Sequence, residues 1–206
     1  RAGSWGNATL HSLLAHHAQA RPTALALKDQ PNRMELTGDA PLSLNWAELD
    51  SASEALAIEL QARGIGAGNR LIAQLPNVVE LAVLYYAASK LGAILSPVPV
   101  QYGSHELRMI AATLGASAMI SIQHLRDTPL AEQARTALPG LPVLAFGSDL
   151  QLLTGPCAQP CERGPGDANA VLSICWTSGT TGTPKGVPRS HNMWLATGRH
   201  SMTAGS

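Results

Sequence analysis

The fold is decided by residues 70–99, which read RLIAQLPNVVELAVLYYAASKLGAILSPVP. A short apolar run, 70–75, lies between a glycine and a proline, as is typical of a buried strand. Residues 77–91 then show the Val, Leu and Ala content of a helix that packs on a sheet, and Gly92 ends them. A second apolar run follows at 93–98. This strand–helix–strand order predicts two parallel strands, because parallel strands need a long crossover connection.

The same alternation continues outward from this stretch. Downstream, Ser104 is expected to cap a helix that ends at Leu114. Further downstream, the strand candidates are 116–122, 142–146 and 171–176, and 129–138 is a short helix candidate. Upstream, the candidates are helices at 9–20 and 46–63 and a weak strand at 23–28, with a loop or hairpin over 29–43. We therefore predict an α/β fold, with a mostly parallel sheet flanked by helices.

Residues 147–169 interrupt this pattern with several glycines and prolines. We call them the connector, and we predict that they separate an α/β subdomain, 1–146, from a segment over 170–206. Cys157 and Cys161 lie in the connector, but a zinc site needs two more ligands nearby, so we predict no metal site there. Three cysteines in the chain also cannot all pair, which argues against a disulfide framework.

The chemistry of the chain is concentrated in residues 177–186, which read TSGTTGTPKG and directly follow an apolar run. Glycines allow backbone N–H groups to approach an anion, hydroxyls donate to phosphate oxygens, and Lys185 supplies a positive charge. Pro184 stands where the common P-loop needs a glycine, and the glycine spacing does not fit the dinucleotide fingerprint. Composition alone leaves a Ser/Thr/Gly-rich hairpin turn as the alternative.

The order of these ten residues closely resembles the phosphate-loop signature of the adenylate-forming (AMP-binding) superfamily, which includes acyl- and aryl-CoA synthetases, peptide-synthetase adenylation domains and luciferases. Residues 44–49, 64–77 and 90–97 are similar to other segments of that family, so the resemblance extends over roughly residues 9–200. Asn69 departs from the pattern, since the family usually has an acidic residue there.

The resemblance implies part of the large N-terminal domain of an enzyme that activates a carboxylic acid. Such enzymes use ATP and Mg²⁺ to form an acyl-adenylate, and then transfer the acyl group to the thiol of coenzyme A or of a carrier-protein phosphopantetheine. The residues implied to hold the ATP phosphates are Thr177, Ser178, Gly179, Thr180, Thr181, Gly182, Thr183 and Lys185. No catalytic residue is assigned within the chain.

Ser190 and His191 follow the loop, where the family often opens a helix. We expect Ser190 to be the N-cap of that helix, and a direct substrate contact by His191 is the alternative. We expect Cys175 to lie in the core. The other histidines that we expect on solvated faces are His11, His16, His17, His105 and His124.

Composition excludes several other classes of protein. The 206 residues carry 14 Lys+Arg against 14 Asp+Glu, so the chain lacks the basic excess that binds a nucleic-acid backbone. No apolar run approaches the roughly 20 residues that span a bilayer, and no signal-peptide pattern opens the chain. We therefore expect a cytoplasmic protein whose partners are a small carboxylic acid and the remainder of a parent chain.

Because the chain lacks an initiator Met and ends within a helix candidate, we expect it to be a piece of a longer enzyme. In the family, the adenine, ribose and most acid-binding segments lie downstream, so we expect the piece alone to be inactive. Three alternatives remain open: an adenylation domain that loads a carrier protein, a non-catalytic nucleotide- or phosphate-binding module, and a scaffold whose loop is only a turn.

Overall fold

The computed structural model describes residues 6–155, 160–177 and 184–204, without the side chains of 199–204. The helices in these ranges are α1 (Leu10–Ala20), α2 (Arg33–Thr37), α3 (Trp46–Ala62), α4 (Val79–Leu91), α5 (Ser104–Leu114), α6 (Leu130–Ala137) and α7 (His191–Ala204). The strands are β1 (Leu25–Lys28), β2 (Ser43–Asn45), β3 (Arg70–Gln74), β4 (Ile94–Pro97), β5 (Ala118–Ile122), β6 (Val143–Phe146), β7 (Val171–Thr177) and β8 (Lys185–Ser190). None of these helices is long and apolar enough to cross a membrane.

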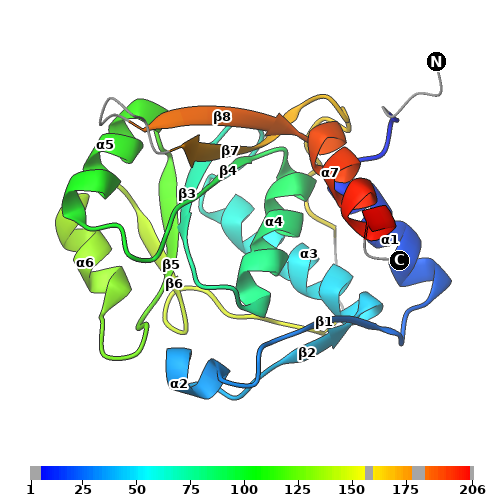
Figure 1. The fold of residues 1–206 in the computed structure, drawn as a ribbon, viewed down its shortest axis with the longest axis horizontal. Helices are drawn as coiled ribbons and strands as arrows, with labels where there is room; N and C mark the ends of the chain where they lie inside the picture. Colours follow the sequence, from blue (N-terminus) through cyan, green and yellow to red (C-terminus); the bar gives the residue numbers. More distant parts are fainter. Residues whose placement is uncertain (1–5, 156–159, 178–183, 205–206) are drawn as a thin grey trace.

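The central sheet has the strand order β6-β5-β3-β4-β7-β8. Every neighbouring pair is parallel except β7 and β8, which pair antiparallel. Helices α5 and α6 cover one face, and α3 and α4 cover the other, with α1 packed against α3 and α4 (Figure 1). Strands β1 and β2 form a separate antiparallel pair. The predicted α/β class with a mostly parallel sheet is confirmed.

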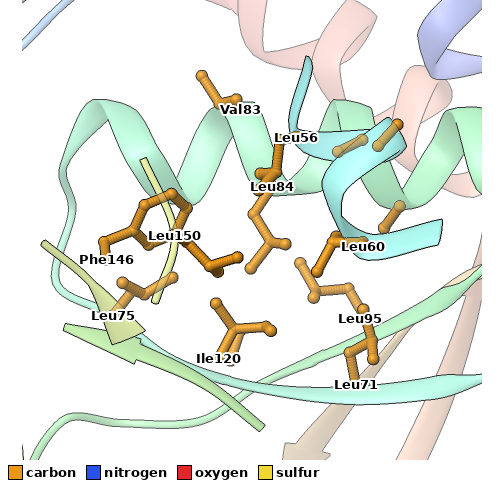
Figure 2. Close-up of a cluster of buried hydrophobic side chains, with 14 of the residues drawn as sticks. Leu56, Leu60, Leu71, Leu75, Val83, Leu84, Leu95, Ile120, Phe146 and Leu150 are labelled. Atoms are coloured by element: carbon orange, nitrogen blue, oxygen red, sulfur yellow. The ribbon is translucent and has the colours of Figure 1, made fainter. Parts of the chain in front are cut away.

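The hydrophobic core lies in two layers because successive strand residues point to opposite faces of the sheet. In β3, Leu71 packs in the layer under α3 and α4, whereas Ile72 packs in the layer under α5 and α6. Figure 2 shows the first layer, where Leu84 of α4 lies over Ile120 of β5 and Leu60 of α3 lies over Leu95 of β4. Each such fully buried side chain contributes about 1.5–3 kcal/mol, so this layer is a major source of the stability of the sheet.

Local sequence signals set most helix ends. The side chain of Asn45 accepts a hydrogen bond from the Glu48 amide, and the Glu48 carboxylate accepts one from the Asn45 amide, so a capping box opens α3. Gly92 ends α4 in the left-handed conformation that glycine adopts at low cost. The N-cap prediction at Ser104 is wrong by one residue: Gly103 is the cap, and the Glu106 carboxylate accepts a hydrogen bond from its amide.

Three elements were not predicted: α2, β2 and β8. Helix α2 lies in the segment expected to be a loop or hairpin, and its first residue, Arg33, is buried. The Arg33 guanidinium donates to Asp29 at 2.6 Å and to both carboxylate oxygens of Glu80 in α4. Because Glu80 is far away in sequence, this ion cluster is invisible to local pattern analysis.

The described part of the connector forms no helix or strand, but it is fixed to the helices beneath it. Lys90 of α4 is almost fully buried, and its Nζ donates to Asp50 and Glu54 of α3 at 2.7 and 2.8 Å. The other oxygen of Glu54 accepts the Cys161 amide at 2.7 Å, and Arg163 also donates to Glu54, at 2.8 Å. One carboxylate therefore joins α3, α4 and the connector.

Candidate functional site

Strands β7 and β8 form a hairpin that brings the two ends of the predicted phosphate loop together. Thr177 is the last residue of β7 and pairs with Lys185, the first residue of β8. Both side chains are exposed, and the Thr177 Oγ1 lies 3.5 Å from the Lys185 carbonyl oxygen. We call Trp176, Thr177, Lys185 and Gly186 the hairpin stem. The Thr177 hydroxyl and the Lys185 ammonium group are therefore exposed side by side on adjacent strands.

Six of the predicted phosphate-binding residues lie outside the described residues: Ser178, Gly179, Thr180, Thr181, Gly182 and Thr183. The hairpin that was the alternative interpretation of this stretch is present, since β7 and β8 are antiparallel. A hairpin does not compete with phosphate binding, because a glycine-rich connection between two strands can present backbone N–H groups to an anion.

The stem is held by residues that the sequence analysis did not single out. The indole Nε1 of Trp176 donates to the hydroxyl of Ser96 in β4 at 2.8 Å. Gly186 pairs with Trp176, and a Cβ built at this glycine would lie 2.9 Å from the Cγ2 atom of Ile174. The only local signal for this arrangement is a tryptophan at the end of an apolar strand, because a buried indole N–H usually has a partner.

Ser190 caps α7, as expected, because its hydroxyl accepts the Met193 amide at 3.3 Å. His191 lies next to it and is 4% exposed. The Nδ1 atom of His191 accepts the Leu10 amide at 3.2 Å, so this ring fixes α1 to the start of α7. Burial lowers the pKa of His191, and Asp167 opposes this shift. A substrate contact by His191 stays a prediction, since its described hydrogen bond is to α1.

The expectation that His11 is solvated is wrong. His11 is half-buried, and its Nδ1 lies 2.9 Å from the hydroxyl of Ser89 in α4. Burial lowers its pKa to about 4, with further contributions from His191, Arg163 and Lys90. The rings of His11 and His191 lie edge to face with their centroids 6.3 Å apart. The two imidazoles therefore lie together at the junction between α1, α4 and α7, where burial favours their uncharged forms.

The described ranges contain no cluster of three or more His, Cys, Asp or Glu residues that could hold a metal ion. Cys175 is a free, partly buried cysteine in β7, and Cys161 is a free, buried one in the connector. Burial raises the pKa of the Cys161 thiol to about 11, and the neighbouring Glu54 adds to the shift. Cys157, the other cysteine considered for zinc, lies outside the described residues.

A cavity of about 530 Å³ lies at the carboxyl ends of β5 and β6, whereas the hairpin stem lies at the opposite edge of the sheet. Its walls include Arg33, Glu80 and Phe146. Thr177 and Lys185, the two predicted phosphate-binding residues that the structure describes, do not line this cavity, so the cavity and the hairpin stem are distinct places.

A family model described as "AMP-binding enzyme" matches residues 14–205 of the chain. The chain belongs to the AMP-binding enzyme family. The chain is 32% identical over 151 residues to the long-chain-fatty-acid–CoA ligase FadD13 of Mycobacterium tuberculosis, covering 72% of the chain and 30% of that protein. It is 31% identical over 208 residues to the salicyl-AMP ligase / salicyl-S-ArCP synthetase of the same species, covering 94% of the chain and 35% of that protein.

Solved structures share the fold of this chain. Mycobacterium smegmatis MbtA in its apo form has a TM-score of 0.76 and 27% identity, covering 95% of this chain and 36% of that one. The Klebsiella oxytoca NpsA N-terminal subdomain has a TM-score of 0.67 at 24% identity, covering 89% and 42%, and shows the shared fold alone. The chain spans about a third of the length of the two curated relatives above.

Proposed function

We propose that this chain provides the phosphate-binding loop of an ATP-dependent ligase that activates a carboxylic acid as an acyl-adenylate. The observation that carries the proposal is the segment TSGTTGTPKG, residues 177–186, in which the exposed residues Thr177 and Lys185 are paired between two antiparallel strands. Membership of the AMP-binding family supports the same activity. A turn without a ligand would need neither this order of hydroxyls nor the lysine.

In this proposal, residues 177–183 bind the β- and γ-phosphates of ATP through backbone N–H groups and hydroxyls. Lys185 lowers the electrostatic cost of bringing a carboxylate to the α-phosphate, because it neutralises charge that grows on the departing pyrophosphate. Thr177 and Lys185 are both exposed, so the Lys185 ammonium can reach a ligand directly, and the Thr177 hydroxyl can do so by exchanging its long, 3.5 Å hydrogen bond to the Lys185 carbonyl. Mg²⁺ would supply further positive charge, and hydroxyl oxygens such as that of Thr177 are suitable donors for it.

The thiol that accepts the acyl group is proposed to be coenzyme A, with a carrier-protein phosphopantetheine as the second candidate. One relative supports each candidate thiol: FadD13 is named a CoA ligase, and the salicyl-AMP ligase is also named a salicyl-S-ArCP synthetase. We further propose that the acid-binding and adenine-binding residues come from other parts of a longer enzyme, that residues 147–169 separate two parts of its N-terminal domain, and that the enzyme acts in the cytoplasm.

The test is ATP–pyrophosphate exchange by a full-length ligase that contains this chain, assayed with a panel of carboxylic acids. Lys185→Ala, alone and with Thr181→Ala, is expected to raise the KM for pyrophosphate at least about tenfold, since a charge-assisted contact is lost. Lys28→Ala removes an exposed lysine of β1 and is the matched control. An unchanged KM and exchange rate in the Lys185 variants would refute the phosphate-loop assignment.

The non-catalytic binding module makes a different prediction. Isothermal titration of the 206-residue chain with ATP and with pyrophosphate separates the two functions. We expect weak binding of ATP, because the chain is proposed to lack the adenine site. Tight ATP binding without exchange activity in the longer protein would favour the binding module instead.

A further inference from the structure

The hydrogen bond between Trp176 and Ser96 links the hairpin stem to the centre of the sheet. The backbone register between β7 and β4 is set at Ser173 and Leu95, three residues before Trp176. Beyond that point, the Trp176 indole donates to the Ser96 hydroxyl at 2.8 Å, and Ser96 has no exposed surface. A buried hydroxyl on the neighbouring parallel strand therefore restrains the end of β7 at Trp176, the residue before Thr177.

Gly186 extends this restraint to the second strand of the hairpin. It pairs with Trp176, and a Cβ at this position would lie 2.9 Å from Ile174 Cγ2 and 3.5 Å from two atoms of the Trp176 ring. The backbone of β8 thus lies directly against the side chains of β7. Lys185 immediately precedes this close contact, so its position depends on how the Trp176 ring is held.

We propose that Trp176, Ser96 and Gly186 are positioning residues, which fix the exposed ends of the hairpin, Thr177 and Lys185, for phosphate binding. The proposal rests on the phosphate-binding function proposed above. None of the three positioning residues is assigned a contact with the phosphates. They act through the backbone: Ser96 holds the indole, the indole holds β7, and the close packing at Gly186 sets β8 against it.

A second indole–hydroxyl pair provides a matched control within the same strand. Trp194 of α7 donates its Nε1 to Ser173 of β7, also at 2.8 Å, and Ser173 has no exposed surface. This pair has the same chemistry and the same burial of its serine. It joins β7 to α7, however, and lies away from the end of the strand that leads into Thr177. If lost packing alone raises the KM for pyrophosphate, variants of both pairs should raise it. If Trp176 and Ser96 position the stem, only variants of that pair should do so.

The experiment measures ATP–pyrophosphate exchange in the full-length ligase with the variants Trp176→Phe and Ser96→Ala and the controls Trp194→Phe and Ser173→Ala. The first two are expected to raise the KM for pyrophosphate about fivefold, the factor that corresponds to one ordinary hydrogen bond, with the KM for the acid unchanged. The double variant, Trp176→Phe with Ser96→Ala, should match the single ones, because both remove the same bond. The controls should stay within about twofold of the parent.

An unchanged KM for pyrophosphate in Trp176→Phe and Ser96→Ala, or an equal rise in the controls, would overturn the positioning role. Thermal unfolding of each variant identifies any that fail to fold, and Gly186→Ala, which keeps the indole bond but crowds Ile174, gives an independent second test with the same expected direction. Lys185→Ala distinguishes the two proposals. If it raises the KM while the Trp176 and Ser96 variants do not, only the positioning role fails; if it has no effect, the proposed function fails.

Discussion

The connector and the hairpin formed by β7 and β8 are both rich in glycine and proline, but the connector is held by contacts to the helices and β8 is exposed to solvent. The connector passes over α3 and α4, where Glu54 accepts the Cys161 amide, and Gly164 donates its amide to the Lys90 carbonyl. In β8, residues 185–189 are all exposed. The comparison shows that the same composition can give a segment fixed by buried contacts or one that presents its groups to solvent. The tertiary environment decides which.

The largest expected effect is the loss of the Glu54 carboxylate. Glu54→Ala removes a partner of Lys90, which is 1% exposed, and also frees the Cys161 amide. We expect the free energy of unfolding to fall by about 3 kcal/mol, since removing one partner leaves a buried charge poorly compensated. Urea-induced unfolding of the parent chain and of the variant measures this difference in free energy. Glu59→Ala, which removes a partly exposed partner of Arg63 in the same helix, should cost less than about 1 kcal/mol. Equal losses would contradict the special role of Glu54.

The next largest effect is expected for Gly164→Ala, which tests how closely the connector approaches α4. A Cβ at Gly164 would lie 2.5 Å from the Leu91 carbonyl oxygen and from the Gly92 amide nitrogen, which are backbone atoms and cannot move aside cheaply. Gly164→Ala is therefore expected to cost about 2 kcal/mol of unfolding free energy. At Gly166, two residues away, nothing lies within 4 Å of a built Cβ, so Gly166→Ala is the control and should be nearly neutral. A neutral Gly164→Ala would show that the connector is not held against α4.

Acidification should weaken the contacts by which Glu54 holds the connector. Burial tends to raise the pKa of Glu54, but hydrogen bonds from Lys90 and the Cys161 amide outweigh burial and lower it to about 2, against an ordinary value of 4.5. Because the folded pKa is the lower one, the contribution of this carboxylate to stability is complete above about pH 4.5 and is lost as the pH falls toward 2. Between pH 5 and about pH 3, unfolding free energy should fall more steeply in the parent chain than in Glu54→Gln. Equal slopes would argue against the shifted pKa.

The smallest effect on stability belongs to the hairpin. Lys185 is exposed, so Lys185→Ala should change the unfolding free energy by less than about 0.5 kcal/mol. The same variant is expected to have a large effect on pyrophosphate exchange, as described above. A stability loss comparable to that of Glu54→Ala would remove the contrast between the two segments, because it would give Lys185 a structural role.

Local signals were sufficient wherever an element is defined by its own residues. The capping box at Asn45, the glycine at 92 and the short apolar runs located α3, α4 and the parallel strands. The ten-residue motif indicated the family, which the family model confirms. Prediction failed where a residue depends on a distant partner. Helix α2 depends on the Arg33–Glu80 ion pair, and His11 is half-buried because α4 and α7 lie beside it.

The sequence by itself determined the α/β class, the family and the place of the proposed phosphate loop, because these depend on the type and order of neighbouring residues. Only the tertiary structure decided that a buried serine of β4 holds the indole next to that loop, and that a glutamate of α3 fixes the connector. The physical reason is the same for both. A hydrogen bond between residues about 80 to 110 positions apart leaves no periodic trace in the chain, and it exists only after the sheet and its helices have brought the two groups together.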